Sequence, residues 1–127
     1  YINDNNLKKV EKIINFTKNP FPYIKKSNLF ILTSTFEGLP NVLLETLVLK
    51  KFIISSKCQT GPSEILLNGK GGLLFQVKNH KQLANKINYY FHNKSECNKL
   101  LQNSLRSLHR FDGKKNLKKY QDLFKNL

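Results

Sequence analysis

The chain has 127 residues, of which 39% are hydrophobic, and this is enough for one globular domain with its own core. No apolar run is long enough to cross a bilayer, and no segment resembles a signal peptide. The net charge of +14 comes from lysines spread along the whole chain with only two arginines, which argues against a sequence-specific nucleic-acid reader.

The predicted elements alternate between strands and helices. The runs over 29–33 and 52–55 are continuously apolar, as is typical of parallel strands buried on both faces. The last three segments repeat their apolar residues at the helical period. In chain order we expect a strand over 10–16, a short helix after Pro20 and Pro22, a strand over 29–33, a helix over 40–49, a strand over 52–55, a short helix over 61–67, a strand over 71–75, and helices over 80–91, 96–109 and 114–126.

This alternation predicts an α/β fold, a Rossmann-like parallel sheet with helices on both faces. Residues 1–127 are interpreted as a single, partial domain in which 96–127 forms a C-terminal helical extension. The chain starts at Tyr1 and contains no methionine, so we expect a processed or truncated piece. Cys58 and Cys97 form no CxxC pair, which indicates a reduced, cytoplasmic protein without a disulfide.

The loop over 34–40 is the first candidate for a binding site. In open parallel sheets, ligands bind beyond the carboxyl ends of the strands, and this loop follows such a strand end. It carries Glu37, and the next helix is expected to start near Pro40. Amides of a first helical turn have no partner inside the helix and suit a diphosphate. These amides belong to Asn41, Val42 and Leu43.

Glu45 stands about one turn farther into the same helix. Apolar residues surround it in the sequence, so we expect this helix to be largely buried. A buried carboxylate is costly unless it is hydrogen-bonded or paired with a charge. Helical side chains lean toward the N-terminus, so Glu45 could accept hydrogen bonds from two neighbouring hydroxyls, such as those of a ribose. The alternative is a core carboxylate bonded to a neighbouring turn.

Three stretches carry a resemblance to a known family: "NPFPYI", "SNLFILTSTFEGLPNVLLETL" and "IISSKCQTGPSEILLNGKGGLLF". Together they resemble the C-terminal, donor-binding half of a glycosyltransferase family 4 enzyme of GT-B fold. The most specific motif is E-G-x-P-N-V-x-x-E, which contains Glu37 and Glu45. Two departures are Asn15, where the family usually has glycine, and "LKKF" over 49–52, which replaces a G-x-P turn.

The resemblance implies a hexosyl- or N-acetylhexosaminyl-transferase that uses a UDP-sugar, retains the anomeric configuration and needs no cofactor or metal. It implies a cell-envelope glycan or a lipid-linked molecule as acceptor, at the inner face of the cell membrane, with peripheral contact to anionic lipid. The acceptor domain and the phosphate clamps of the family would precede this chain. We therefore expect the chain alone to be inactive.

The resemblance also assigns site residues. Glu37 would be the catalytic residue that touches the transferred sugar, and Glu45 would hold the ribose. The remaining donor-binding residues would be Gly38, Leu39 and Pro40 beside the sugar, Asn41 and Val42 at the phosphates, and Phe16, Thr17, Lys18 and Asn19 near the base.

Simpler interpretations remain open beside these assignments. Glu37 alone could be a solvated loop residue, Glu64 a helix cap, and Cys58 an inert thiol. The basic final helix could be a solvated face instead of a membrane anchor. The alternative function is a catalytically inactive, truncated remnant, or a basic binding module with the same fold. His80, His92 and His109 are expected at the surface, in no metal-ligand spacing.

The scattered charge leads to a first prediction. Binding of DNA should be weak, independent of sequence and lost steeply between low and physiological salt, as expected for lysine contacts to phosphates alone. Fluorescence anisotropy with two unrelated duplexes at several salt concentrations measures this. Binding of one duplex in preference to the other at physiological salt would contradict it.

Overall fold

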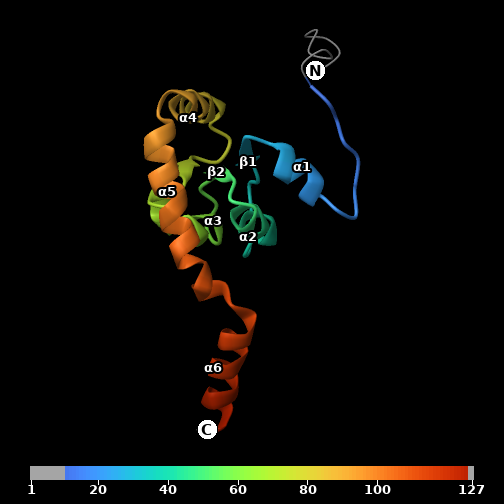
Figure 1. Cartoon of the computed structure of the whole chain (residues 1–127), viewed down its shortest axis with the longest axis vertical. Helices are drawn as coiled ribbons and strands as arrows, with labels where there is room; N and C mark the ends of the chain where they lie inside the picture. Colours follow the sequence, from blue (N-terminus) through green and yellow to red (C-terminus); the bar gives the residue numbers. More distant parts are fainter. Residues whose placement is uncertain (1–10, 126–127) are drawn as a thin grey trace.

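The computed structural model describes residues 11–125, and Figure 1 shows them as one α/β body with a projecting C-terminal helix. The elements are α1 (Phe21–Lys26), β1 (Leu29–Leu32), α2 (Asn41–Val48), β2 (Phe52–Ser56), α3 (Pro62–Ile65), β3 (Leu73–Phe75), α4 (His80–His92), α5 (Lys94–Ser107) and α6 (Gly113–Lys125), with 3-10 turns η2 (Leu67–Gly69) and η3 (Leu108–Phe111).

The three strands form one parallel sheet in the order β1-β2-β3. Leu29 of β1 lies opposite Phe52 of β2, and Ile54 of β2 lies opposite Leu73 of β3. The prediction that these segments share a parallel sheet is confirmed. Within residues 11–125, the outer edge of β1 pairs with no other strand.

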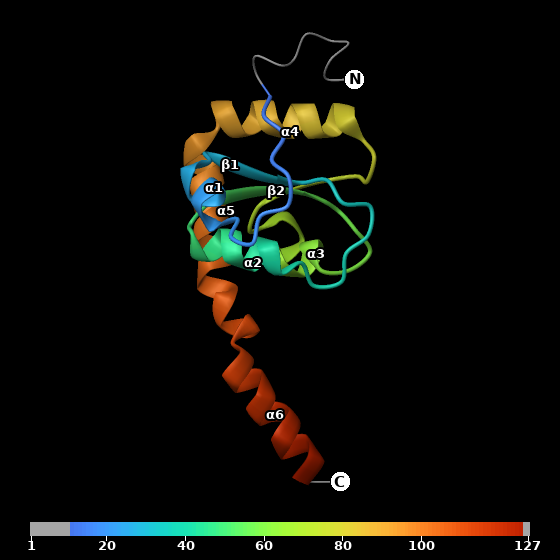
Figure 2. The same ribbon diagram turned by 90° about the vertical axis from the view of Figure 1, so that its right-hand side faces the viewer.

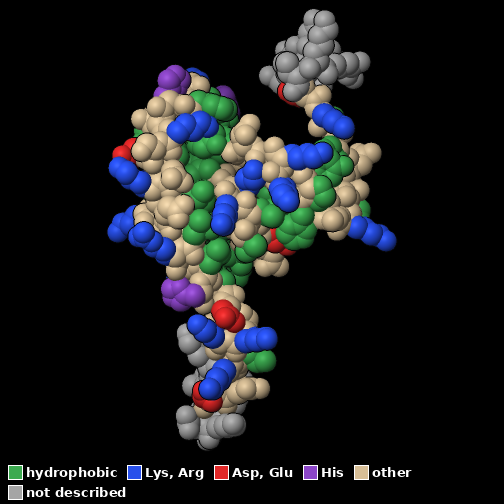
Figure 3. All heavy atoms as spheres, viewed as in Figure 1, with side chains coloured by type: hydrophobic (Ala, Val, Ile, Leu, Met, Phe, Trp, Pro, Cys, Tyr) green, Lys and Arg blue, Asp and Glu red, His purple; other side chains and the backbone are tan. Residues whose placement is uncertain are grey.

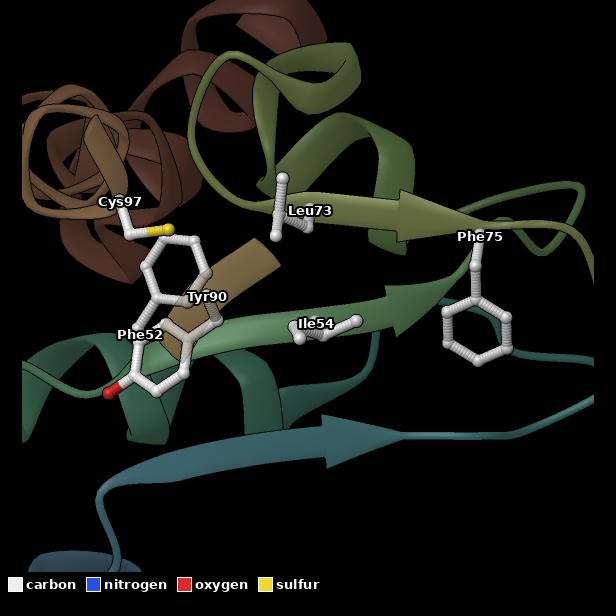
Figure 4. Close-up of a cluster of buried hydrophobic side chains, with 6 residues drawn as sticks. All are labelled: Phe52, Ile54, Leu73, Phe75, Tyr90 and Cys97. Carbon is white, nitrogen blue, oxygen red and sulfur yellow. The ribbon is translucent and has the colours of Figure 1, made fainter. Parts of the chain in front are cut away.

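Helices cover both faces of the sheet, as predicted. Figure 2 shows α4 on one side of the strands, with α2 and α3 on the other. Alternate residues of β2 point to opposite faces, so Ile54 belongs to one core cluster and Ile53 to the other. Figure 4 shows the cluster on the α4 side, formed by Phe52, Ile54, Leu73, Phe75, Tyr90 and Cys97.

α5 contributes to both clusters because it runs past the sheet from one face to the other. Cys97, near its start, is buried with the α4-side residues, and Leu105, near its end, packs on the α2 side. Leu101 lies between them and contacts both clusters. α6 continues beyond this body and projects away from it (Figures 1 and 2).

The predicted strand over 10–16 is wrong for residues 11–16, and Val10 lies outside the described residues. Residues 11–16 form neither strand nor helix, and Ile13 and Phe16 are 74% and 93% exposed. An apolar run becomes a strand only when a neighbouring strand accepts its backbone hydrogen bonds. No such neighbour is present in the described part of the chain.

The burial of α2 is also narrower than predicted. Leu43 and Leu47 are fully buried against the sheet, whereas Val48 is 67% exposed. The helix therefore buries one face and leaves the other open, as is usual for a helix lying on a sheet.

This difference supports a paired prediction. Leu47→Ala should lower the free energy of unfolding by about 2–5 kcal/mol, because it leaves a cavity in a closed core. Val48→Ala, one residue away on the open face, should change it by no more than about 0.5 kcal/mol. Urea unfolding followed by circular dichroism measures both. Equal losses in the two variants would contradict the orientation of α2.

Candidate functional site

The loop between β1 and α2 lies at the carboxyl ends of the strands, where the sequence placed it. In Figure 2 it runs on the right-hand side of the sheet, beside the loop that follows β2. Glu37 is half-buried at the centre of this loop. Its backbone carbonyl accepts a hydrogen bond of 2.7 Å from the Thr60 hydroxyl of the neighbouring loop.

Gly61 holds the two loops together by close backbone contact. Its φ is +81°, and a Cβ at this position would collide with the carbonyl oxygen of Gly38 and lie 2.6 Å from Cδ of Pro40. Only glycine combines this backbone conformation with the absence of a side chain. Any larger residue would therefore push the Glu37 loop away from its neighbour.

The start of the loop is fixed by a second set of contacts. The Ser56 hydroxyl donates a hydrogen bond of 2.6 Å to the carbonyl oxygen of Ser34, and the Cys58 thiol donates to the same oxygen at 3.2 Å. Ser56 and Cys58 are both buried. Cys58 is thus a free, buried thiol that anchors the loop, in keeping with its interpretation as an inert residue.

The N-terminus of α2 differs in detail from the prediction. Pro40 is buried and is the N-cap residue, and its carbonyl oxygen accepts a hydrogen bond of 3.0 Å from the Leu43 amide. The expectation that the Leu43 amide is free is therefore wrong. Within residues 11–125, the amides of Asn41 and Val42 have no protein acceptor. These two N–H groups carry the positive end of the helix dipole.

Glu45 lies one turn farther along α2 and is half-buried. Among the described residues, its carboxylate makes no hydrogen bond and no ion pair, so the structure contains no bond to a neighbouring turn. The Glu37 side chain is likewise half-buried and without a partner in this part of the chain. The loop after β1 and the helix that follows it therefore each carry one carboxylate that is free, among the described residues, to accept hydrogen bonds from a ligand.

The remaining predicted residues occupy different places. Gly38 and Leu39 are exposed on the same loop. Thr17 and Asn19 form a local turn before α1, and Asn19 lines a cavity of about 570 Å³ with Leu49, at the opposite end of α2. Glu37, Gly38, Leu39, Pro40, Asn41, Val42 and Glu45 follow one another along the loop and α2, whereas Asn19 lies at the other end of that helix.

Other candidates make no contribution to this site. Glu64 lies in the first turn of α3 but makes no capping hydrogen bond, so its assignment as a cap is wrong. His80, His92 and His109 are exposed, as predicted. In the part of the chain that the structure describes, no three His, Cys, Asp or Glu side chains are grouped to hold a metal ion, and no helix has the length and apolar character to cross a membrane.

The fold and this loop define the class of protein. A family model described as "Glycosyl transferases group 1" matches residues 2–107. The chain therefore belongs to the group 1 glycosyltransferases, with the α/β fold of GT-B enzymes. The solved structure of HepE of Anabaena in complex with UDP is similar to this chain, with a TM-score of 0.87 and 22% identity. The match covers 99% of this chain and 35% of the HepE chain.

Two curated relatives agree with this assignment. An uncharacterized glycosyltransferase of Methanocaldococcus jannaschii is 46% identical over 65 residues, which are 51% of this chain and 16% of the relative. N-acetylgalactosamine-N,N'-diacetylbacillosaminyl-diphospho-undecaprenol 4-alpha-N-acetylgalactosaminyltransferase of Campylobacter jejuni is 30% identical over 82 residues, 65% of this chain and 22% of the relative. The chain thus spans about a fifth of the length of the curated relatives it matches.

The contact between Gly61 and Gly38 generates a prediction with a matched control. Gly61 and Gly69 both have positive φ, but a Cβ at Gly69 would meet nothing within 4 Å. Both alanine variants carry the backbone cost of roughly 1–2 kcal/mol, and Gly61→Ala should cost about 1–3 kcal/mol more because the loops must separate. Thermal unfolding of the two variants measures the difference, and equal melting temperatures would contradict it.

Proposed function

We propose that this chain is the donor-binding part of a retaining glycosyltransferase of family 4 that uses a UDP-sugar. In the reaction, the bond between the anomeric carbon and the UDP oxygen breaks, a bond to an acceptor hydroxyl oxygen forms with the same anomeric configuration, and the hydroxyl proton is released. The proposal includes no resident metal or cofactor. UDP leaves as the second product.

One observation carries the proposal. Two carboxylates without protein partners, those of Glu37 and Glu45, flank a helix start at which the amides of Asn41 and Val42 also have no protein acceptor within residues 11–125. A nucleotide sugar supplies the complementary groups: hydroxyl donors on the ribose and the sugar, and phosphate acceptors between them. Donors and acceptors therefore match along one ligand.

The order of these residues along the loop and α2 suggests which part of the ligand each one would bind. The Asn41 and Val42 amides would face the diphosphate, because they stand at the positive end of the helix dipole. Glu45 would accept hydrogen bonds from the two ribose hydroxyls. Glu37 would bind the transferred sugar, with the backbone of Gly38, Leu39 and Pro40 along the sugar's edge. Phe16, Thr17 and Lys18 would lie near the base, whereas Asn19 lies at the other end of α2.

The relatives support the substrate classes. HepE was solved with UDP, and the Campylobacter relative is named as an N-acetylgalactosaminyltransferase acting on a diphospho-undecaprenol-linked glycan. By analogy we propose a hexosyl or N-acetylhexosaminyl donor and a lipid-linked or cell-envelope glycan acceptor. Transfer would occur at the cytoplasmic face of the membrane, where a chain of net charge +14 is attracted to anionic lipid.

Because the chain spans about a fifth of its curated relatives, we propose that it binds the donor without transferring the sugar by itself. The alternative is an inactive remnant or a basic binding module that keeps this fold. The two functions differ in one measurable property, which is binding of UDP. A folded chain that binds no UDP even at millimolar concentration favours the alternative.

Glu45 provides the test of the ribose contact. Glu45→Gln should weaken UDP binding by roughly ten- to a hundredfold, because loss of a charge-assisted hydrogen bond costs about 1.5–3 kcal/mol. Isothermal titration of the 127-residue chain with UDP measures this. Glu64→Gln is the matched control, because Glu64 is an exposed carboxylate on α3 outside the site. Unchanged UDP affinity in the Glu45 variant would contradict the role of Glu45.

Glu37 should behave differently because its ligand is the sugar. Glu37→Gln should leave UDP affinity within about twofold of wild type and abolish transfer when the chain is part of a complete enzyme. Radiolabelled sugar transfer and UDP titration, measured side by side, separate the two effects. A Glu37→Gln enzyme with wild-type turnover would remove Glu37 from the chemistry.

A further inference from the structure

A cavity lies at the amino ends of the strands, at the opposite end of the sheet from Glu37. Asn28 directly precedes β1, Lys51 and Phe52 begin β2, and the junction of α4 and α5 closes the other side. The cavity has a volume of about 220 Å³ and is lined by Asn28, Lys50, Lys51, Phe52, Tyr90, Lys94, Cys97, Asn98 and Leu101.

The floor of this cavity is built from fixed aromatic groups. Phe52 and Tyr90 stack with ring centroids 5.2 Å apart, and the Tyr90 hydroxyl donates a hydrogen bond of 2.6 Å to the carbonyl oxygen of Asn28. Figure 4 shows both rings beside Cys97 at the amino end of β2, with Phe75 at the other end of the sheet. These contacts give the cavity a fixed shape before any ligand arrives.

The Cys97 thiol belongs to this floor and is inert. Burial raises the pKa of the thiol, and this effect outweighs the opposing charge of Lys94, with the nearby Glu96 also raising the pKa. The thiol therefore stays protonated at neutral pH and contributes an apolar surface.

The charged residues that line the cavity are all positive. Lys50, Lys51 and Lys94 line it, and no carboxylate is among the lining residues. The Lys94 ammonium lies 3.3 Å from the centroid of the Tyr90 ring and is thereby held over the floor. Figure 3 views this end of the sheet and shows Lys and Arg side chains across the middle of the face.

The lysines of the rim are not neutralised by the protein. In the described part of the chain, none of the three forms an ion pair, and the nearby Glu96 pairs instead with Lys99 at 3.1 Å. Lys50 adopts a φ of +56° in the turn between α2 and β2. Lys50 and the next residue, Lys51, both line the cavity at this turn. A cavity with walls of one charge concentrates counter-ions of the opposite sign.

We propose that this cavity binds the phosphate group of an organic phosphate, with the lysine ammonium groups on the phosphate oxygens. Three ammonium groups suit a phosphate, which offers several charged acceptor oxygens to point-charge donors. Asn28 and Asn98 also line the cavity, and an asparagine side chain offers a neutral amide donor. The site is separate from the Glu37 loop and does not depend on the proposed donor binding.

The probe is glycerol 3-phosphate, titrated into the ¹⁵N-labelled 127-residue chain at constant ionic strength and followed by amide chemical shifts. We expect saturable shifts centred on residues 50–52 and 94–98. The variant Lys51→Gln/Lys94→Gln should lose affinity roughly tenfold or more. The control Lys70→Gln/Lys81→Gln removes the same two charges from exposed positions outside the cavity and should bind like wild type.

A second arm separates a lipid headgroup from a soluble phosphate. Wild type and the two double variants are sedimented with vesicles of phosphatidylcholine and phosphatidylglycerol. If only the cavity variant loses vesicle binding, the site is assigned to a lipid headgroup. Binding of glycerol 3-phosphate without such a difference assigns it to a soluble organic phosphate. Absence of saturable shifts at residues 50–52 and 94–98 in wild type overturns the proposal, as does equal loss in both double variants. The wild-type shifts decide this even if the cavity variant is unstable.

Discussion

Complete burial of β2 is the constraint on which the rest of the structure depends. All five of its residues are buried, although a strand of a three-stranded sheet could leave one face open. Its alternating side chains require an apolar layer on each side, which the helices supply. The carboxyl end of the strand contains Ser55 and Ser56, whose hydroxyls donate to carbonyl oxygens and so avoid the cost of burial.

The polar end of β2 explains how an exposed loop keeps a defined position. Ser56 and Cys58 hold the loop at Ser34, and Thr60 and Gly61 hold it at Glu37 and Gly38. These contacts thus fix the backbone at Glu37, while the carboxylate makes no hydrogen bond or ion pair within residues 11–125. A fixed backbone and a free carboxylate suit a binding group, because the loop needs no reordering when the ligand arrives and the carboxylate has no protein bond to give up.

The sequence predicted those features that depend on local patterns. Continuous apolar runs identified β1 and β2, and helical periodicity identified α4 and α5. The run over 11–16 was misjudged because its residues cannot reveal whether a neighbouring strand is present to pair with them. Free amides at the start of α2 were predicted correctly for Asn41 and Val42, but the bond from Leu43 to Pro40 depends on the bend of the chain at the cap.

The contacts that hold the Glu37 loop in place could not be predicted, because they join residues that are far apart in the sequence. Thr60 and Glu37 are 23 residues apart, and no periodicity links them. The Gly61-Pro62 pair indicated a turn, yet the turn itself did not show that a second backbone passes against the glycine. The basic cavity was missed for a related reason: "LKKF" departs from the family pattern, but Lys94 lies far along the chain and joins it only in the fold.

The path of α5 has a consequence for how the domain is made. Both core clusters need side chains from this helix, and in chain order it follows every strand and every other helix that packs on the sheet. During synthesis, the sheet therefore leaves the ribosome exit tunnel with its apolar faces incompletely covered. The α4-side core needs residues up to Leu101, and the α2-side core needs residues up to Phe111. Folding of the nascent chain should accordingly be late and abrupt, with a period of exposure in which chaperones can bind β2.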